Sequence, residues 1–537
     1  MIKKNISHPL VTLFILYLLA YGFILINNGV WWDDWCLYNM KSEGIKDLCS
    51  GIGSFYLAPI HIFLQGISSH AALVYHFLAF VLYFLVSVFL FNTLQYFKID
   101  VNMQLMLSAF FTVLPINIAR IYMCCFHYTL GIFFCFAGIF FFTVAYYKKQ
   151  FFFRLAALIC SFLSFAFLPS TYVFIPMYIV FLVGLNSIIY EHSITENLRS
   201  FIKKILKYSD FFIITLLSWS LFKIFAKPTG VYAAENYNAI SWQALLQSPI
   251  DIVLSYIENL IKLTWITTLL NNTFIVIIFV IIFVLLLIIF CKKTCFLPKI
   301  NYLITIPFQK KTIKLSVFIV LGFYFFIAGS LAYIAVGKSP ISMHLPNSRY
   351  QTLLGLGISL TVLGFVLSCF REKYLKYVFI FLLSIFITNN IEKCLIFQRL
   401  HYKNVAFMEE LSEQETILNN RNFMLIDITP LDDHNASFYT FQGMAKKTFG
   451  DETRFIITKE EYSKLSMNYD SFKRSYNMNE MQFNGYFDFY MIIEEGDVKL
   501  RRTATFIKLM IFDLFNKDRF FQEINNVLTI TCLPYPK

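Results

Sequence analysis

The chain has 537 residues, of which 58% are hydrophobic and only 15% are charged. A soluble protein of this length cannot bury so much apolar surface, and the longest apolar runs reach the roughly 18 residues needed to cross a bilayer. This composition excludes a soluble enzyme and predicts an α-helical polytopic membrane protein.

The net charge of +12 is distributed unevenly along the chain. Residues 1–391 carry 27 basic against 12 acidic side chains, whereas residues 392–537 carry 18 against 21. The basic excess lies in short loops between apolar runs, with 19 residues on one side of the predicted membrane and 8 on the other. This pattern is typical of membrane proteins whose positive loops stay in the cytoplasm, and it argues against a nucleic-acid-binding groove.

The amino-terminal part begins with two lysines and an apolar run over about residues 9–27. This run lacks a small-residue cleavage site, so we expect a retained anchor and not a cleaved signal. A long external loop follows over about residues 28–69. About eleven spans are predicted in all. After the first, they cover about residues 70–96, 103–119, 127–147, a hairpin of two spans within 152–190, 210–226, 273–291, 315–335, 350–370 and 375–391.

The charge bias places the amino terminus in the cytoplasm, and an odd number of spans then places the carboxyl terminus outside. Two further external loops are predicted over about residues 227–269 and 337–349. In the first of them, residues 250–265 have apolar side chains at helical spacing with charged residues between them. This spacing predicts an amphipathic helix that lies along the membrane surface.

Residues 392–537 predict a small soluble α/β domain on the external face. Residues 423–428 and 487–493 have the composition of strands, and residues 459–465 and 518–527 have that of helices. The predicted organisation is a transmembrane domain over residues 1–391 followed by an extracytoplasmic domain over residues 392–537.

The first external loop opens with two adjacent acids among tryptophans. Three of the six tryptophans of the chain lie between Trp31 and Trp35, and they flank Asp33 and Asp34. Acids are scarce in the predicted membrane part, so a pair at headgroup depth indicates chemistry. A carboxylate there can take the proton of a hydroxyl acceptor. A departing phosphate would also need a cation, either a basic side chain or a metal held by carboxylates.

Adjacent acids cannot both point the same way on a regular element, so Asp33 and Asp34 should have different roles. One would face the reaction, and the other would orient the loop or bind a metal. We favour Asp34 as the base, because it lies farther from the membrane span. The alternative is a helix N-cap flanked by interfacial tryptophans, but capping needs one aspartate and not two.

Basic and polar candidates lie in the other external segments. Arg349 ends the third loop, where it can hold a phosphate by two parallel hydrogen bonds or extend to the lipid headgroups. Lys338 and His344 share this loop and could assist a phosphate site or be solvated. The turn before the span at 127–147 adds Arg120 as a further phosphate ligand. The residues expected to line the site are His61, His127, Tyr128 and His344, with packing as the alternative role of His61.

Metal and thiol chemistry have weaker signals. No cofactor is assigned, and a divalent ion such as Mg²⁺ or Mn²⁺ is the alternative to a basic side chain beside the acid pair. The stretch Asp432 to Asn435 has metal-ligand residue types, but such clusters after a proline are more often turns. Cys36 and Cys49 share the first external loop, and both a disulfide and two free thiols remain open.

The retained first span, the acid pair Asp33-Asp34 at the start of the first external loop, the run of about eleven spans and the external carboxyl-terminal domain together resemble the GT-C superfamily of integral-membrane glycosyltransferases. The resemblance covers roughly residues 1–391. It implies a catalytic acid in the first external loop, a polyprenyl-phosphate-linked sugar as donor, and a basic residue late in the membrane domain for the donor phosphate. Arg349 matches that last position.

The nearest likeness is to bacterial enzymes that modify O-antigen or other surface glycans. It implies a glycan or lipid acceptor, surrounding membrane lipids as further partners, and a place in the bacterial inner membrane with the active site on the periplasmic face.

Three other functions remain open. A polymerase or ligase of lipid-linked glycans would use similar loops with a polymeric acceptor. A transporter or flippase usually carries charges at mid-membrane and repeated halves, and neither feature is evident in the sequence. A non-catalytic scaffold for the soluble domain is the third.

Overall fold

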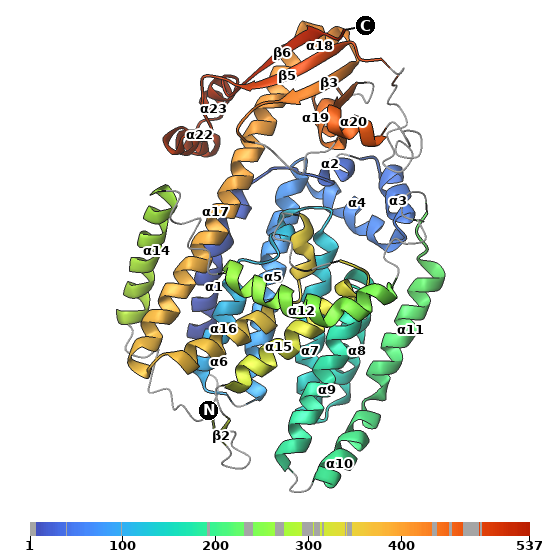
Figure 1. Cartoon of the computed structure of the whole chain (residues 1–537), viewed down its shortest axis with the longest axis vertical. Helices are drawn as coiled ribbons and strands as arrows, with labels where there is room; N and C mark the ends of the chain where they lie inside the picture. Colours follow the sequence, from blue (N-terminus) through green and yellow to red (C-terminus); the bar gives the residue numbers. More distant parts are fainter. Residues whose placement is uncertain are drawn as a thin grey trace.

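The computed structural model is an elongated bundle of helices with a small sheet at one end (Figure 1). It describes residues 7–38, 40–97, 99–190, 194–229, 233, 240–263, 273–292, 304–305, 312–313, 316–338, 340, 346–431, 438–450, 454–465, 483 and 486–536. The prediction of an α-helical polytopic membrane protein is confirmed.

Six helices within these residues are long and apolar enough to cross a membrane, and a seventh span results if one bent pair is counted as a single span. The six lie in α1 (Ser7–Tyr21) with η1 (Gly22–Ile26), α5 (Ala71–Tyr96), α7 (Phe126–Lys148), α14 (Thr273–Lys292), α15 (Ser316–Ile334) and α17 (Glu372–Glu413). The bent pair is α10 (Ile194–Lys207) with α11 (Ser209–Phe225), which meet at 54°.

The other predicted spans coincide with helices whose apolar part is shorter, with 10–17 residues. These are α6 (Val101–Val113), α8 (Phe151–Phe167), α9 (Thr171–Tyr190) and α16 (Gly355–Cys369). The remaining short elements of this part are α2 (Asp34–Leu37), α3 (Ser42–Gly51), η2 (Phe55–Leu57), α4 (Ala58–Ile67), η3 (Ile118–Ile121), η5 (Pro346–Gln351) and the antiparallel pair β1 (Ile304–Thr305) and β2 (Thr312–Ile313).

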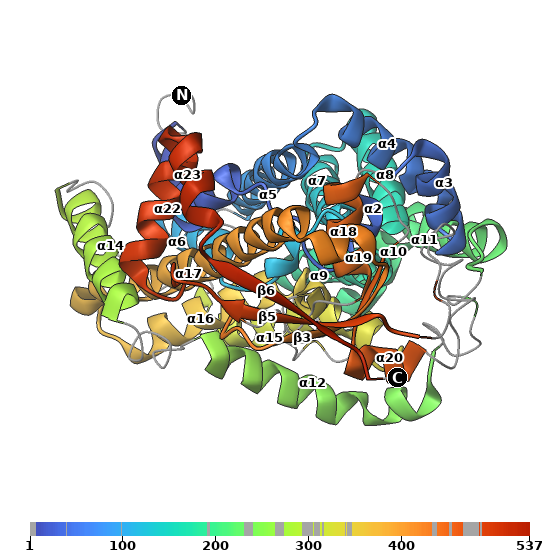
Figure 2. The ribbon, with the colours of Figure 1, turned by 90° about the horizontal axis from the view of Figure 1, so that it is seen from above.

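Helix α12 (Trp242–Leu263) runs across the bundle and not along it, as Figures 1 and 2 both show. Trp242 and Leu246 on its outer side are 80% and 83% exposed. Asn259 on its inner side is buried, and its amide donates to the Pro340 carbonyl at 3.2 Å. An outward apolar stripe fits a helix that lies along a membrane surface, as the spacing over residues 250–265 predicts. Residues 264 and 265 lie outside the described part.

The carboxyl-terminal part contains a four-stranded mixed sheet in the order β4-β3-β5-β6. Its strands are β3 (Asn422–Asp427), β4 (Phe455–Thr458), β5 (Phe489–Glu495) and β6 (Leu528–Pro534), and its helices are α18 (Glu415–Asn419), α19 (Phe438–Phe449), α20 (Lys459–Leu465), α22 (Thr503–Phe515) and α23 (Lys517–Ile524). β3 is parallel to β4 and β5, whereas β6 is antiparallel to β5. The predicted strands correspond to β3 and β5, and the predicted helices to α20 and α23.

One helix connects the two parts of the chain. α17 has 42 residues, a length of about 63 Å at 1.5 Å per residue, and it runs from the bundle to the sheet (Figure 1). The predicted domain boundary at residues 391/392 lies inside it. At its far end the Lys403 amine binds the Asp427 carboxylate at 2.5 Å and the Leu431 carbonyl at 2.6 Å. This ion pair fixes the sheet to the helix.

Two glycines allow a close crossing of α15 and α16. A Cβ at Gly322 of α15 would lie 2.7 Å from the Gly357 carbonyl, and a Cβ at Gly357 of α16 would lie 2.6 Å from the Phe326 nitrogen. Such small residues let helix backbones approach in a membrane, where van der Waals packing and not water exclusion drives association.

Gly357→Ala should therefore destabilise the protein by about 1–3 kcal/mol, the usual effect of overpacking, and lower its thermal unfolding midpoint in detergent. Gly66→Ala in α4 is the matched control, because a Cβ at Gly66 meets no atom within 4 Å. Equal midpoints for the two variants would contradict the close crossing.

Candidate active site

The segment from Trp31 to Trp35 makes a sharp turn into α2. Gly29 precedes it without a side chain, and a Cβ there would lie 2.1 Å from the Trp31 ring. Trp31 is buried and stacks on His76 with ring centroids 5.7 Å apart. Trp32 has a left-handed backbone with φ of 51°, a conformation that costs an L-residue about 1–2 kcal/mol. The strained turn brings Asp33 and Asp34 to the start of α2.

Asp34 is fully buried, with 0% exposure. Its Oδ1 accepts a hydrogen bond from the Cys124 amide at 2.8 Å, across 90 residues of sequence. Its Oδ2 is buried and has no hydrogen-bond partner among the described residues. Burial raises the pKa of Asp34 to about 7, and the charge of Asp33 adds to this effect while the backbone hydrogen bond opposes it. Asp34 thus has one oriented oxygen and one oxygen available to a proton.

Asp33 occupies the N-cap position of α2, but its side chain makes no capping hydrogen bond. The geometry therefore gives no support to the alternative in which the pair is a helix cap. Instead, Asp33 Oδ1 accepts a hydrogen bond from the Tyr439 hydroxyl of α19, in the carboxyl-terminal domain. Burial raises the pKa of Asp33 to about 6, against the opposing effects of the Tyr439 hydroxyl and the Arg349 charge.

Arg349 lies on η5 between two aromatic rings. Its guanidinium carbon is 5.1 Å from the Trp32 ring centroid and 4.9 Å from that of Tyr350. It donates hydrogen bonds to the Pro346 carbonyl at 3.2 Å and to the Tyr350 hydroxyl at 3.0 Å. No described carboxylate lies within ion-pair distance of it, and its charge acts on Asp33 from a greater distance. Arg349 therefore lies over the ring of Trp32, the residue that precedes Asp33 in the chain.

Lys338 joins this basic group from the end of α15. Its amine lies 5.5 Å from the Tyr350 ring centroid, on the same residue that contacts Arg349. Burial, followed by repulsion from Arg349, lowers the pKa of Lys338. Two positive side chains are thus held close together.

The turn from Ile118 to Phe126 contacts both the acid loop (Trp31–Trp35) and the arginine loop (η5). Its Cys124 amide binds Asp34, and its Ala119 amide donates to the Ser348 hydroxyl, next to Arg349, at 2.8 Å. Because one turn holds both segments, the acid loop and the arginine loop have a fixed relative position.

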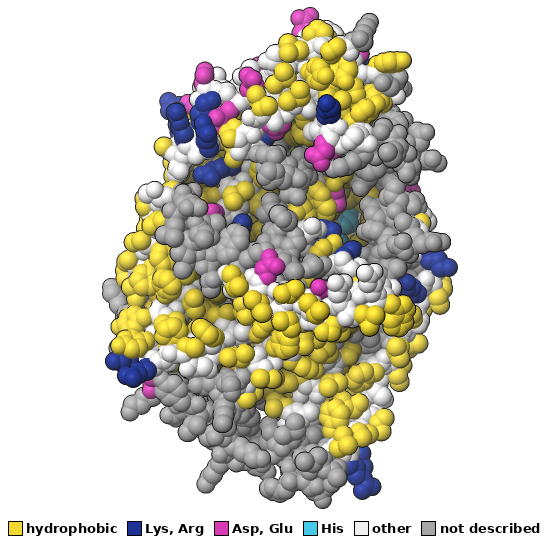
Figure 3. Space-filling model, viewed as in Figure 1, with side chains coloured by type: hydrophobic (Ala, Val, Ile, Leu, Met, Phe, Trp, Pro, Cys, Tyr) yellow, Lys and Arg dark blue, Asp and Glu magenta, His cyan; other side chains and the backbone are white. Residues whose placement is uncertain are grey.

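Three further predicted lining residues lie near this turn. His127 donates through Nδ1 to the Cys124 carbonyl at 2.9 Å, which leaves its Nε2 as an acceptor. Its ring lies 4.1 Å from that of Tyr128, and its charge interacts with His61 and Arg349. His61 bonds to the Tyr75 hydroxyl at 2.7 Å, consistent with the packing role weighed for it. Figure 3 shows acidic, basic and histidine side chains together in a hollow between the carboxyl-terminal domain and α12.

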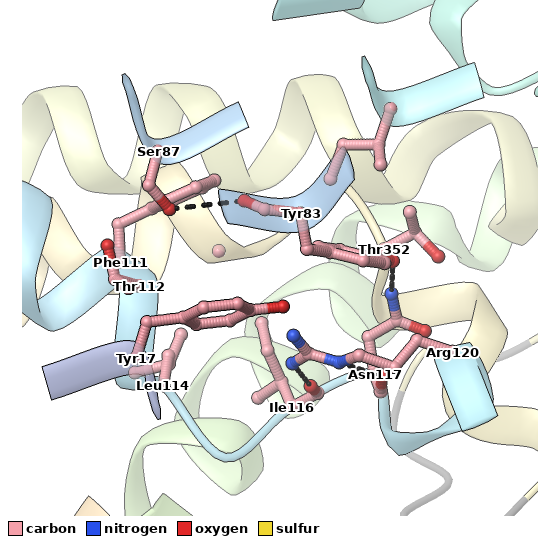
Figure 4. Close-up of a pocket in the computed structure, with 12 residues that line it drawn as sticks. Tyr17, Tyr83, Ser87, Phe111, Thr112, Leu114, Ile116, Asn117, Arg120 and Thr352 are labelled. Carbon is pink, nitrogen blue, oxygen red and sulfur yellow. Dashed lines mark hydrogen bonds between the residues drawn. The ribbon is translucent and has the colours of Figure 1, made fainter. Parts of the chain in front are cut away.

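Arg120 has a separate environment. Its guanidinium is 8% exposed and lies 3.9 Å and 4.4 Å from the ring centroids of Tyr21 and Tyr83. Its hydrogen bonds go to the Tyr21 hydroxyl at 2.6 Å and to the Ile116 and Asn117 carbonyls, each at 3.2 Å. Figure 4 shows Arg120, Asn117 and Tyr83 beside a small cavity of about 30 Å³, with the Tyr17 hydroxyl pointing toward Arg120. None of these described partners belongs to the group around Asp33.

Several predicted positions are not part of this group. His344 and Asp432 to Asn435 lie outside the described residues. Cys36 and Cys49 are both free thiols. No cluster of three or more His, Cys, Asp or Glu side chains with a metal-holding arrangement occurs in the described part of the chain.

Sequence reasoning missed the contributions of Tyr439 and Trp32 to this site. Tyr439 is one of 32 tyrosines and lies 406 residues from Asp33, so composition and spacing do not distinguish it. The sequence identifies Trp32 only as one of the tryptophans that flank the acid pair, whereas in the structure its ring contacts Arg349.

Comparison with known proteins adds no relative. No family model matches the sequence, and no curated protein matches it significantly. The function of the chain must therefore be argued from the site itself.

Proposed function

We propose that this protein is a membrane glycosyltransferase of the GT-C type. It would move a sugar from a polyprenyl-phosphate donor to a lipid-linked or surface glycan of the O-antigen or lipopolysaccharide kind. The observation that carries the proposal is that the cation Arg349 lies over Trp32 and acts on Asp33, in the same turn that holds the buried carboxylate Asp34. An acid and a cation at one place are what transfer from a phosphate to a hydroxyl requires.

Asp34 suits the role of general base. Its Oδ1 is fixed by the Cys124 amide, and its Oδ2 has no described partner. A pKa near the working pH balances readiness to accept a proton against the need to be ionised beforehand. Burial brings the pKa of Asp34 to about 7, into that range.

Arg349 and Lys338 suit the donor phosphate. A guanidinium can bind two phosphate oxygens by parallel hydrogen bonds, and that of Arg349 lies over the rings of Trp32 and Tyr350. In the proposed reaction the acceptor hydroxyl gives its proton to Asp34, and its oxygen bonds to the anomeric carbon. The bond from that carbon to the phosphate oxygen breaks, and its electron pair leaves on the polyprenyl phosphate, whose charge the two cations offset.

The proposal includes about eleven spans, a cytoplasmic amino terminus and a site on the periplasmic face of a bacterial inner membrane. The short helices α6, α8, α9 and α16 would complete the spans by tilting or by thinning the bilayer locally. Support for one-sided chemistry comes from the position of the group beside the carboxyl-terminal domain, at the end of the bundle. A polymerase or ligase would share these catalytic atoms and differ in its polymeric acceptor.

Asp34→Asn should abolish sugar transfer, because an amide cannot accept the acceptor's proton. We expect kcat to fall by about 10²–10⁴-fold, measured as transfer from a polyprenyl-phosphate sugar in membranes or proteoliposomes. Asp251→Asn on α12 is the matched control and should retain full activity. Full activity of Asp34→Asn would refute the assignment, and movement of the donor across the bilayer without a new glycosidic bond would favour a flippase.

Arg349→Gln should weaken the use of the donor. Loss of charge-assisted hydrogen bonds to phosphate should lower kcat/KM for the donor roughly ten- to hundredfold, and Arg349→Lys should lose less because it keeps the charge. Arg371→Gln, at an exposed position just before α17, serves as the control. A normal KM and kcat in Arg349→Gln would exclude Arg349 as the phosphate ligand.

The pH profile of kcat should show a single fall on its acid side. A base with a raised pKa works above that pKa and loses activity as it is protonated, so kcat should fall as the pH drops through about 7. A pH profile of kcat at saturating donor tests this. A profile that stays flat through this region would mean that Asp34 is not the titrating base.

A further inference from the structure

One face of helix α19, in the carboxyl-terminal domain, packs on the segment that contains the acid pair and α2. Tyr439 donates to Asp33, Gly443 packs on Trp35, and the Lys447 amine lies 5.0 Å from the Tyr38 ring centroid. The three α19 residues are four positions apart, so they form a single stripe along the helix. Their partners follow the order of the chain from the acid pair through α2.

Gly443 allows the close approach on which this contact depends. A Cβ at this position would lie 2.8 Å from the Trp35 Cβ and 2.9 Å from its ring. Any larger residue would push α19 away from α2 and separate the Tyr439 hydroxyl from Asp33.

The other sides of α19 are fixed to the rest of its domain. Phe441 packs edge-on against Phe407 of α17, with ring centroids 5.9 Å apart. Gln442 donates to the Ile456 carbonyl of β4 at 3.3 Å. The position of Tyr439 is therefore determined by α17 and by the sheet, and not by a mobile loop.

We propose that Tyr439 is a positioning residue of the active site, which orients the Asp33 carboxylate and thereby leaves Asp34 as the proton acceptor. The inference rests on the proposed function and extends it, because it makes the carboxyl-terminal domain a working part of the site. Two adjacent carboxylates repel each other, and a hydroxyl donor on one of them fixes which is stabilised as the anion.

The charges around Asp33 agree with this order of ionisation. Arg349 faces it from η5, Asp34 is its chain neighbour, and the thiols of Cys36 and Cys124 lie within electrostatic range. Tyr439 and Arg349 favour the ionised form of Asp33, whereas Asp34 is fully buried, and the hydrogen bonds from Cys124 and Met123 that favour its ionised form are opposed by the charge of Asp33. As the pH rises, Asp33 therefore loses its proton at a lower pH than Asp34.

Tyr439→Phe is the direct test, because it removes the hydroxyl and keeps the ring. Without the hydroxyl, Asp33 is ionised to a smaller extent and its charge raises the pKa of Asp34 less. We therefore expect the acid limb of the kcat profile to move downward by up to about one pH unit, with little change in the donor KM. Gly443→Ala should move the limb in the same direction by displacing α19. Tyr490→Phe, the same substitution on β5, should leave the profile unchanged.

Infrared titration of the carboxylic C=O band gives a readout that needs no activity. The band lost in Asp33→Asn should titrate at higher pH in Tyr439→Phe than in the wild type. Transfer that depends on Asp34, with neither the limb nor the band shifted in Tyr439→Phe, would overturn the positioning role and leave the proposed function intact. If the band shifts but the wild-type protein transfers no sugar, Tyr439 still positions Asp33 and the proposed glycosyltransferase function is wrong.

Discussion

Burial of the Asp34 carboxylate is the constraint on which the end of the bundle beside the carboxyl-terminal domain depends. A carboxylate without solvent is costly unless hydrogen bonds replace the lost water. The Cys124 amide supplies one such bond, so the turn before α7 must lie against the turn before α2. The same turn binds Ser348 and so brings Arg349 to Trp32. One buried charge thus accounts for the meeting of three segments that are far apart in sequence.

The acid pair also explains the strain at Trp32. A left-handed tryptophan is unfavourable, yet it sends Trp31 into the core against His76 and leaves Trp32 beside Arg349. An extended backbone would place both rings differently relative to the acids. The energy stored in this turn is offset by the burial of Trp31, one of the largest fully buried side chains of the described chain.

Much of this could be predicted from the sequence, because charges stand out in an apolar chain. Asp33, Asp34, Arg349 and Lys338 were all evident on that ground, and the structure brings them together. Arg120 was equally evident but lies among tyrosines, whose aromatic faces can satisfy a cation without any carboxylate. Tyr439 could not be predicted, because its role comes from the folding of a remote domain and not from local pattern.

Secondary structure was predictable where the apolar run is long, as in α5 and α7. Strands β4 and β6 were missed, because short strands are defined by their pairing partners and not by their own residues. The number of spans depends on helices near the minimum length, such as α6 with 13 residues, for which composition alone does not decide.

The continuity of α17 has a consequence for how the two parts of the chain meet. Domains joined by a flexible linker find each other with an effective concentration set by the length of that linker. α17 is instead a continuous helix of about 63 Å, roughly twice the thickness of the hydrocarbon core, so the two domains are held at a fixed distance. Because α19 packs on α17, a tilt of α17 within the bilayer would move the Tyr439 hydroxyl relative to Asp33.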